Sequence, residues 1–150
     1  MSQSLSKIIL HNVFSTKHRA PLIPYSLKDE LYAYLTIASQ SLGSYVHKIG
    51  GTSDHIHICC TLPRTVTVST LLENFKSSSS RWMKTKGKHL SNFAWQNGYA
   101  SFSVNPYHFD GLLQYIENQE QHHRKACYKE EVVGLLKRHS VEYDERYLWN

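Results

Sequence analysis

The sequence predicts an α+β fold in which two helices cover one face of an antiparallel sheet. Three observations support this prediction. Short runs rich in β-branched residues alternate with longer stretches of helical periodicity, turn-forming residues separate the runs, and the sequence after residue 104 is helical in pattern. A length of 150 residues suits one ordinary domain with its own core, so we expect a single domain over residues 1–150.

The first two predicted elements are a strand and a helix. Residues 7–15 (KIILHNVFS) are apolar and contain β-branched side chains, which favours a strand. Ser26 precedes apolar residues at helical spacing and Gly43 follows them, so we expect Ser26 to cap the start of a helix that ends near Gly43.

Two short strands and a second helix follow. Residues 44–49 and 55–62 are strand candidates, and Gly50 and Gly51 predict a turn between them. A second helix opens at Thr67 or a neighbouring residue and weakens at Gly87.

The remaining elements are one strand and further helices. Residues 95–104 (WQNGYASFSV) read as a strand that a glycine interrupts, and Asn105-Pro106 is typical of a helix start. A third helix is expected over about 107–125 and a shorter one around 129–139. The last stretch, VEYDERYLWN, has no clear period, and its apolar residues favour packing on the domain or on a dimer partner.

The order up to residue 104 is β-α-β-β-α-β, which is the ferredoxin-like arrangement of a four-stranded antiparallel sheet. The later helices would be added to this unit. Composition agrees with a globular protein, because 41% of residues are hydrophobic and 19% are charged. No apolar run is long enough to span a membrane, and the first residues do not resemble a signal peptide. Three cysteines, two of them adjacent, favour a reducing cytoplasm over a disulfide framework.

The charge is unevenly distributed. Residues 1–109 carry 11 Lys and Arg against 4 Asp and Glu, whereas residues 110–150 carry 6 against 8. A basic body with a mildly acidic tail suits a polyanion such as nucleic acid. An ordinary basic cytoplasmic protein is the alternative explanation for a net charge of +5.

A pair of histidines in the third predicted strand could bind a metal ion. In Asp54-His55-Ile56-His57, strand alternation directs both imidazoles to one face and Ile56 to the other, into the core. Two neutral imidazoles so placed can share a metal ion. The alternative is chance, because the chain contains 10 histidines.

A tyrosine and a glutamine lie one helical turn apart in the third predicted helix. Tyr115 and Gln119 have i, i+4 spacing, so the phenol and the carboxamide would face the same site. A core aromatic and a solvated polar residue are the alternative. One of His122 and His123 could line the same site, but adjacent helical residues are not expected to do so together.

The second predicted helix carries a basic, serine-rich segment, FKSSSSRW. Its positive charge, small hydroxyls and aromatic neighbours suit phosphate contact and base stacking. The candidate DNA-binding residues are Lys76, Ser79, Arg81 and Lys84. Alternatively, the segment is a solvated helix end whose cations complement the helix dipole.

Cys59 would share a strand face with His55 and His57. A zinc site of two imidazoles and one thiolate is therefore conceivable, and it would make the protein a zinc hydrolase. No second cysteine pair supports this, so Cys59 and Cys60 are better explained as buried structural thiols.

Taken together, the motifs resemble the small HUH single-tyrosine transposases of bacterial insertion sequences, whose relatives include the REP-associated tyrosine transposases. The resemblance covers residues 7–150 and rests on the order of these segments: DHIH, FKSSSSRW, WQNGYASFSV, YIENQEQHHRK and YDERYLW. The chain departs from the family pattern at Lys76-Ser77, where Lys-Gly is frequent, and at Ala100-Ser101, where Gly-Ala is expected.

This resemblance implies a role for each candidate residue. His55 and His57 correspond to the family's metal-binding histidines, Tyr115 to its nucleophile and Gln119 to its third metal ligand. It further implies cleavage and rejoining of single-stranded DNA through a 5′-phosphotyrosine intermediate, with Mg²⁺ or Mn²⁺ as cofactor. The implied substrates carry terminal hairpins, the implied assembly is a homodimer in which Tyr115 can act in trans, and no nucleotide cofactor or membrane is expected.

Two alternatives to a strand transferase stay open at this point. One is a non-catalytic module, derived from such a transposase, that binds a nucleic-acid hairpin. The presence of the tyrosine, both histidines and the glutamine favours the enzyme over this module. The other is the zinc hydrolase with Cys59.

Overall fold

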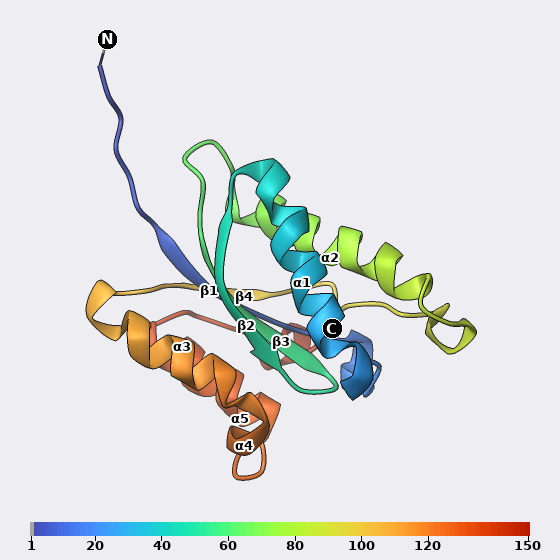
Figure 1. Cartoon of the computed structure of the whole chain (residues 1–150). Helices are drawn as coiled ribbons and strands as arrows, with labels where there is room; N and C mark the ends of the chain where they lie inside the picture. The colour runs from blue at the N-terminus through green and yellow to red at the C-terminus, as the bar shows by residue number, and fades with distance from the viewer. Residues whose placement is uncertain (1) are drawn as a thin grey trace.

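A computed structural model of the chain describes residues 2–150 (Figure 1). Its centre is one four-stranded sheet, formed by β1 (Ile9–Ser15), β2 (Tyr45–Gly51), β3 (His55–Thr61) and β4 (Ala100–Ser103). The strand order is β2-β3-β1-β4, and every neighbouring pair is antiparallel. This confirms the predicted α+β class with a ferredoxin-like sheet.

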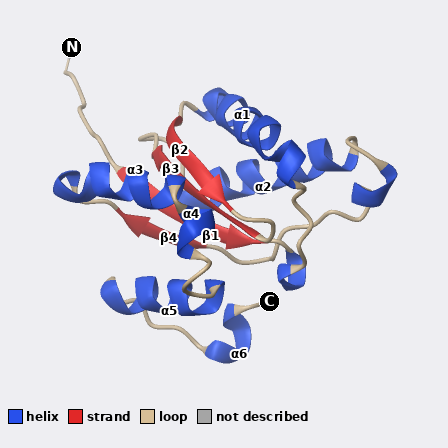
Figure 2. Cartoon of the chain, turned by 60° about the horizontal axis from the view of Figure 1, so that its bottom comes forward, coloured by secondary structure: helices blue, strands red, loops and turns tan. Residues whose placement is uncertain are grey.

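Helices cover both faces of the sheet. Helices α1 (Lys28–Ala38) and α2 (Val68–Lys84) lie on one side, and α3 (Phe109–Glu117), α4 (Gln119–His122), α5 (Tyr128–Arg138) and α6 (Glu145–Leu148) lie on the other (Figures 1 and 2). Short 3-10 turns connect several elements, at Lys17–Arg19, Tyr25–Leu27, Ser39–Leu42, Lys88–Leu90 and Pro106–His108.

Strand alternation gives each face its own core. Leu10, Phe14, Ile56 and Ile58 point toward α1 and α2 and belong to the larger hydrophobic cluster. Val13 and Phe102 point the other way, into a second cluster with apolar residues of α5 and the C-terminal tail. Burial of both faces explains why β1 and β3 consist almost entirely of buried residues.

Several predicted boundaries needed correction. Ser26 is not a helix cap, because a 3-10 turn over Tyr25–Leu27 leads into α1 and no side chain caps it. The expected helix over 107–125 is divided at Asn118, whose backbone is not helical (φ −94°, ψ 20°). The tail, whose sequence shows no clear period, contains the short helix α6. Thr67 caps α2 by accepting from the Thr70 amide, as the sequence predicts.

Gly50 and Gly51 belong to β2 rather than to a turn, and they pair with His57 and Ile56 of β3. The helix α3 packs directly on this strand at Gly50. A Cβ atom at Gly50 would lie 2.0 Å from the backbone oxygen of Ile116. Only glycine allows this close approach, and the approach positions the helix that carries Tyr115.

Within residues 2–150, no helix is long and apolar enough to cross a membrane. All three cysteines are free thiols, Cys59 and Cys60 buried and Cys127 exposed.

Candidate functional site

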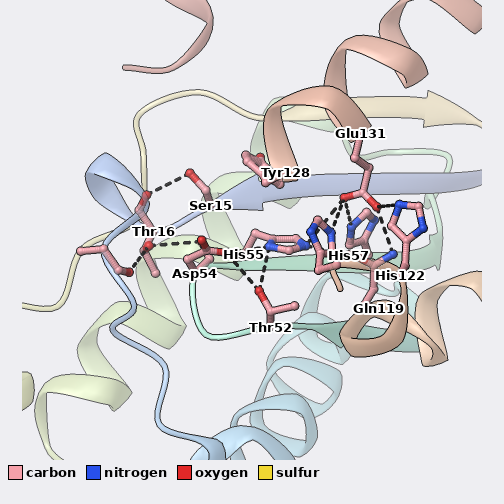
Figure 3. A network of polar contacts seen from close by, with 12 residues as sticks. Ser15, Thr16, Thr52, Asp54, His55, His57, Gln119, His122, Tyr128 and Glu131 are labelled. Carbon is pink, nitrogen blue, oxygen red and sulfur yellow. Dashed lines mark hydrogen bonds and ion pairs between the residues drawn. The ribbon is translucent and has the colours of Figure 1, made fainter. Parts of the chain in front are cut away.

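His55 and His57 lie side by side on β3 and face the layer formed by α3, α4 and α5 (Figure 3). Both side chains are fully buried, and the intervening Ile56 is buried in the opposite core. The alternation expected from the sequence is therefore confirmed, and the two rings meet with centroids 5.3 Å apart.

Tyr115 and Gln119 reach the same place from the helical layer. Oε1 of Gln119 lies 3.2 Å from Nε2 of His55, and the Tyr115 ring centroid lies 5.8 Å from that of His57. The division of the helix at Asn118 does not separate the pair, because the Gln119 amide still points back at the Tyr115 carbonyl oxygen, 3.4 Å away. The structure thus assembles all four predicted site residues within one chain.

Glu131 of α5 lies at the centre of the site and was missed by the sequence analysis. Its carboxylate is 1% exposed, with Oε1 3.0 Å from Nε2 of His57 and 3.1 Å from Nε2 of His123. The other oxygen, Oε2, accepts hydrogen bonds from the Tyr115 hydroxyl and the Gln119 amide. One signal could have found it, since Glu131 shares the apolar face of α5 with Tyr128 and Leu135 at helical spacing.

The adjacent histidines at the end of α4, His122 and His123, both reach Glu131, contrary to expectation. Nε2 of His123 lies near Oε1, and Nε2 of His122 lies 3.3 Å from Oε2. This is possible because α4 ends at His122 and the carboxylate offers two oxygens. His122 is one-third exposed, whereas His123 is 13% exposed.

The electrostatics of the site favour an ionised Glu131 and a neutral His57. Burial alone would raise the pKa of Glu131, but hydrogen bonds from His123, His57 and Tyr115 outweigh it and the pKa falls well below its usual value. Burial lowers the pKa of His57 to about 4, although Glu131 opposes this. Burial and the nearby carboxylate raise the pKa of Tyr115, which keeps the resting phenol protonated.

The Nδ1 atoms of His55 and His57 are held by hydrogen bonds to residues outside the cluster. Nδ1 of His55 lies 2.7 Å from Oδ1 of Asp54 and 3.0 Å from Oγ1 of Thr52, and Nδ1 of His57 lies 2.8 Å from Nε2 of His11. An ionised carboxylate only accepts, so Nδ1 of His55 carries the proton in its bond to Asp54. Such partners fix the tautomer of metal-binding histidines and orient the ring.

The contact between His55 and Gln119 brings two acceptors together. When Nδ1 carries the only proton of the ring, Nε2 of His55 presents a lone pair, and it faces Oε1 of Gln119 at 3.2 Å. The amide cannot be reversed without turning Oε1 onto the Glu131 carboxylate, to which its nitrogen now donates. Two facing acceptors need a proton or a cation between them, so the donor chemistry fits a bound metal ion.

Spacing agrees with this chemistry. One ligand atom from each of His55, His57, His123 and Glu131 lies within 4.8 Å of the others. Imidazole and carboxylate ligands of one ion, bonded at about 2.0–2.2 Å, lie roughly 3–3.5 Å apart, so a small contraction would suffice. Cys59 does not belong to this set among residues 2–150, and burial raises the pKa of its thiol to about 12. The hypothesis of a zinc site formed by His55, His57 and Cys59 is therefore wrong.

The four predicted DNA-binding residues of α2 differ in their exposure. Arg81 and Lys84 are exposed. Lys76 is half-buried, and its ammonium donates to the carbonyl oxygens of Gln96, Asn97 and Gly98 at 2.6–3.1 Å.

Ser79 is the one predicted DNA contact that the structure corrects. The side chain is fully buried, donates to the Phe75 carbonyl oxygen and accepts from the Trp95 indole. It holds α2 against the segment before β4 and is not available to DNA.

Two cavities flank Tyr115. One of about 670 Å³ opens toward β4 and α5 and includes His11, Tyr107 and Arg138 in its wall. The other, of about 480 Å³, includes His122, Arg124 and Lys125. Cationic side chains therefore stand on both sides of the phenol.

Two solved transposases share this fold. A candidate transposase from Deinococcus radiodurans is 21% identical, with a TM-score of 0.61 over 79% of this chain and 98% of that one. A REP-associated tyrosine transposase bound to a REP hairpin is 15% identical, with a TM-score of 0.54 over 77% of this chain and 70% of that one. Residues 4–119 match the family model described as "Transposase IS200 like", and the chain belongs to this family of transposases. No functionally curated protein matches the chain at a significant level.

Proposed function

We propose that this transposase cleaves and rejoins single-stranded DNA through a covalent bond between Tyr115 and a 5′-phosphate. One observation carries the proposal: the Tyr115 hydroxyl, the histidine pair and Gln119 converge on one site in a chain of the IS200-like transposase family. A tyrosine at a cluster of potential metal ligands suits nucleophilic attack on a phosphodiester.

His55, His57 and Gln119 are the residues that we propose hold a divalent cation, Mg²⁺ or Mn²⁺. When bound, such a cation supplies charge neutralisation at the scissile phosphate. The protein residues do the positioning. Asp54 and His11 fix the two imidazoles from behind, and the carboxamide of Gln119 is held by Glu131.

Tyr115 is the proposed nucleophile. Its oxygen attacks phosphorus, the bond from phosphorus to the 3′-oxygen breaks, and the 3′-oxygen leaves as a hydroxyl after taking up a proton. The phenol gives up its own proton, for which Glu131 is the nearest acceptor. In the reverse step a 3′-hydroxyl attacks the phosphotyrosine, so the energy of the broken bond is retained and no nucleotide cofactor is needed.

The proposed substrate is DNA with hairpins near the element ends. The similar REP-associated transposase is bound to a REP hairpin, which supports this substrate class. On this chain, Arg81 and Lys84 of α2 offer exposed positive charge for the backbone. We propose a homodimer as the working assembly, with cleavage by the tyrosine of the same chain, because Tyr115 already lies beside its own His57.

A gel assay tests the proposal. Purified protein is mixed with single-stranded hairpin oligonucleotides from the element ends, labelled at either end, together with Mg²⁺ or Mn²⁺. We expect a metal-dependent covalent adduct that retains only the label on the 3′ side of the cut and is lost in Tyr115→Phe. Tight hairpin binding without any adduct would instead support the non-catalytic hairpin-binding module.

A further inference from the structure

We propose that the metal site has two further protein ligands, His123 and Glu131, and that it therefore selects a transition-metal ion such as Mn²⁺ or Zn²⁺ over Mg²⁺. This inference deepens the proposed function and rests on it for the presence of a metal ion. Both residues lie beyond the stretch 4–119 that matches the family model, so the family match does not supply them.

The geometry around Oε1 of Glu131 carries the proposal. This one oxygen lies 3.0 Å from Nε2 of His57, 3.1 Å from Nε2 of His123 and 3.7 Å from Nε2 of His55. Three imidazole nitrogens and a carboxylate oxygen from three separate segments thus converge on one buried point. The separations are close to those between ligands of a single ion.

The Glu131 carboxylate already accepts several hydrogen bonds, so its burial does not by itself require a cation. Glu131 is 1% exposed and His55 and His57 are fully buried. A buried carboxylate needs a compensating positive charge or several donors. With Nδ1 of His55 donating to Asp54, the Nε2 lone pair of this ring points into the cluster and not to a donor. A divalent ion would compensate the carboxylate and satisfy this lone pair together.

The two carboxylate oxygens of Glu131 contact different groups. Oε1 faces the imidazoles, whereas Oε2 accepts from the Tyr115 hydroxyl and the Gln119 amide. Glu131 therefore joins the metal site to the nucleophile and holds Tyr115 beside the cluster. With Oε1 of Gln119 as a further donor near His55, a six-coordinate ion would keep one position for a phosphate oxygen.

The types of ligand atom determine which metal ion the site should bind most tightly. Mg²⁺ prefers oxygen ligands and retains several waters, whereas three imidazoles suit borderline first-row ions. A site with three histidines and one carboxylate should thus bind Mn²⁺ and Zn²⁺ more tightly than Mg²⁺.

Titration of the metal-free protein with Mn²⁺, Zn²⁺ or Mg²⁺, each alone in a calorimeter, tests the proposal without DNA. Glu131→Gln keeps the side-chain shape, and His123→Ala removes a ring from a turn. Glu130→Gln and His89→Ala are matched controls at exposed positions. Circular dichroism confirms that each variant is folded, and His123→Ala keeps the test valid if Glu131→Gln does not fold.

We expect both site variants to lose affinity for Mn²⁺ by more than the roughly 10–100-fold that outer-shell changes cost, with both controls unchanged. The Mn²⁺ electron paramagnetic resonance spectrum should change as well. If Glu131→Gln and His123→Ala bind Mn²⁺ as tightly as the wild type and only His55→Ala loses affinity, Glu131 and His123 are not ligands. That result would leave the proposed function intact. Tighter binding of Mg²⁺ than of Mn²⁺ would overturn the metal assignment. Normal metal binding without a DNA adduct would contradict the proposed function alone.

Discussion

The hydroxyl of Tyr115 donates a hydrogen bond to Oε2 of Glu131, and this bond joins α3 to α5 across the buried histidine cluster. The hydrogen bond places a carboxylate directly beside the proposed nucleophile. An ionised carboxylate beside the nucleophile repels a DNA phosphate unless positive charge is present between them. A divalent ion at the cluster would supply that charge, so the proposed mechanism couples metal binding to approach of the substrate.

Substitution of Gly50 should displace the helix that carries Tyr115. Gly50→Ala places a Cβ atom 2.0 Å from the Ile116 backbone oxygen, and such overpacking costs typically about 1–3 kcal/mol or more. We expect a lower free energy of unfolding in urea and loss of adduct formation. Gly134→Ala is the control, because no atom beyond the neighbouring backbone of its own helix lies within 4 Å of the added Cβ and a helical alanine stabilises by roughly 0.5–1 kcal/mol. Equal stability of the two variants would contradict the packing of α3 on β2.

Ser79 should matter for stability and not for DNA contact. Ser79→Ala leaves the buried Trp95 indole without its acceptor, at a cost of about 1–3 kcal/mol. The exposed Ser77 gives a control with the same chemical change. Hairpin affinity of folded Ser79→Ala should equal that of the wild type, whereas Arg81→Ala and Lys84→Ala should each weaken binding and flatten its salt dependence. A specific loss of affinity in Ser79→Ala would restore it as a DNA contact.

Asp54 should increase the metal affinity of the site through its hydrogen bond to Nδ1 of His55. Asp54→Asn weakens the hydrogen bond that orients the ring, and changes to such partners typically cost about 10–100-fold in metal affinity. Calorimetric titration with Mn²⁺ measures the effect, and Asp29→Asn at an exposed position is the control. Unchanged affinity in Asp54→Asn would show that this carboxylate does not support the metal site.

The metal-free protein should lose stability on acidification. His57 has a folded pKa of about 4 against a usual value of 6.5, and burial also lowers the pKa of His11. Between these values protons bind the unfolded chain preferentially, so the free energy of unfolding falls as pH falls, by up to about 1.4 kcal/mol per pH unit for each group. Glu131, with its lowered pKa, adds to the loss below pH 4.5. Urea unfolding in chelator from pH 7 to 4.5 measures this, and a flat profile would contradict the burial of the two imidazoles.

Local patterns explain what the sequence could predict. Alternation in β3 places His55 and His57 on one face with Ile56 on the other, and i, i+4 spacing keeps Gln119 close to Tyr115. These relations depend on neighbours in the chain and hold even across the break at Asn118. The strand order could also be predicted, because the order of elements permits few topologies.

Long-range packing explains what was missed. Glu131 is 74 residues from His57. Helical spacing in α5 can indicate that this acid is buried, but not that it meets β3. Ser79 was misassigned because its segment reads as basic and polar, although its spacing from Phe75 places it on the buried face of α2. Gly50 and Gly51 look like a turn in sequence, but the close approach of α3 requires Gly50 and the close approach of the β3 backbone requires Gly51.

Locating the covalent bond tests the central claim most directly. The adduct with a hairpin oligonucleotide is digested with nuclease and trypsin, and the peptide from His89 to Arg124 is sequenced by mass spectrometry. This peptide contains three tyrosines, Tyr99, Tyr107 and Tyr115, so it carries its own internal controls. We predict a nucleotide phosphate on Tyr115 alone. A nucleotide on Tyr99 or Tyr107, or on no tyrosine of the chain, would contradict the assignment of Tyr115 as the nucleophile.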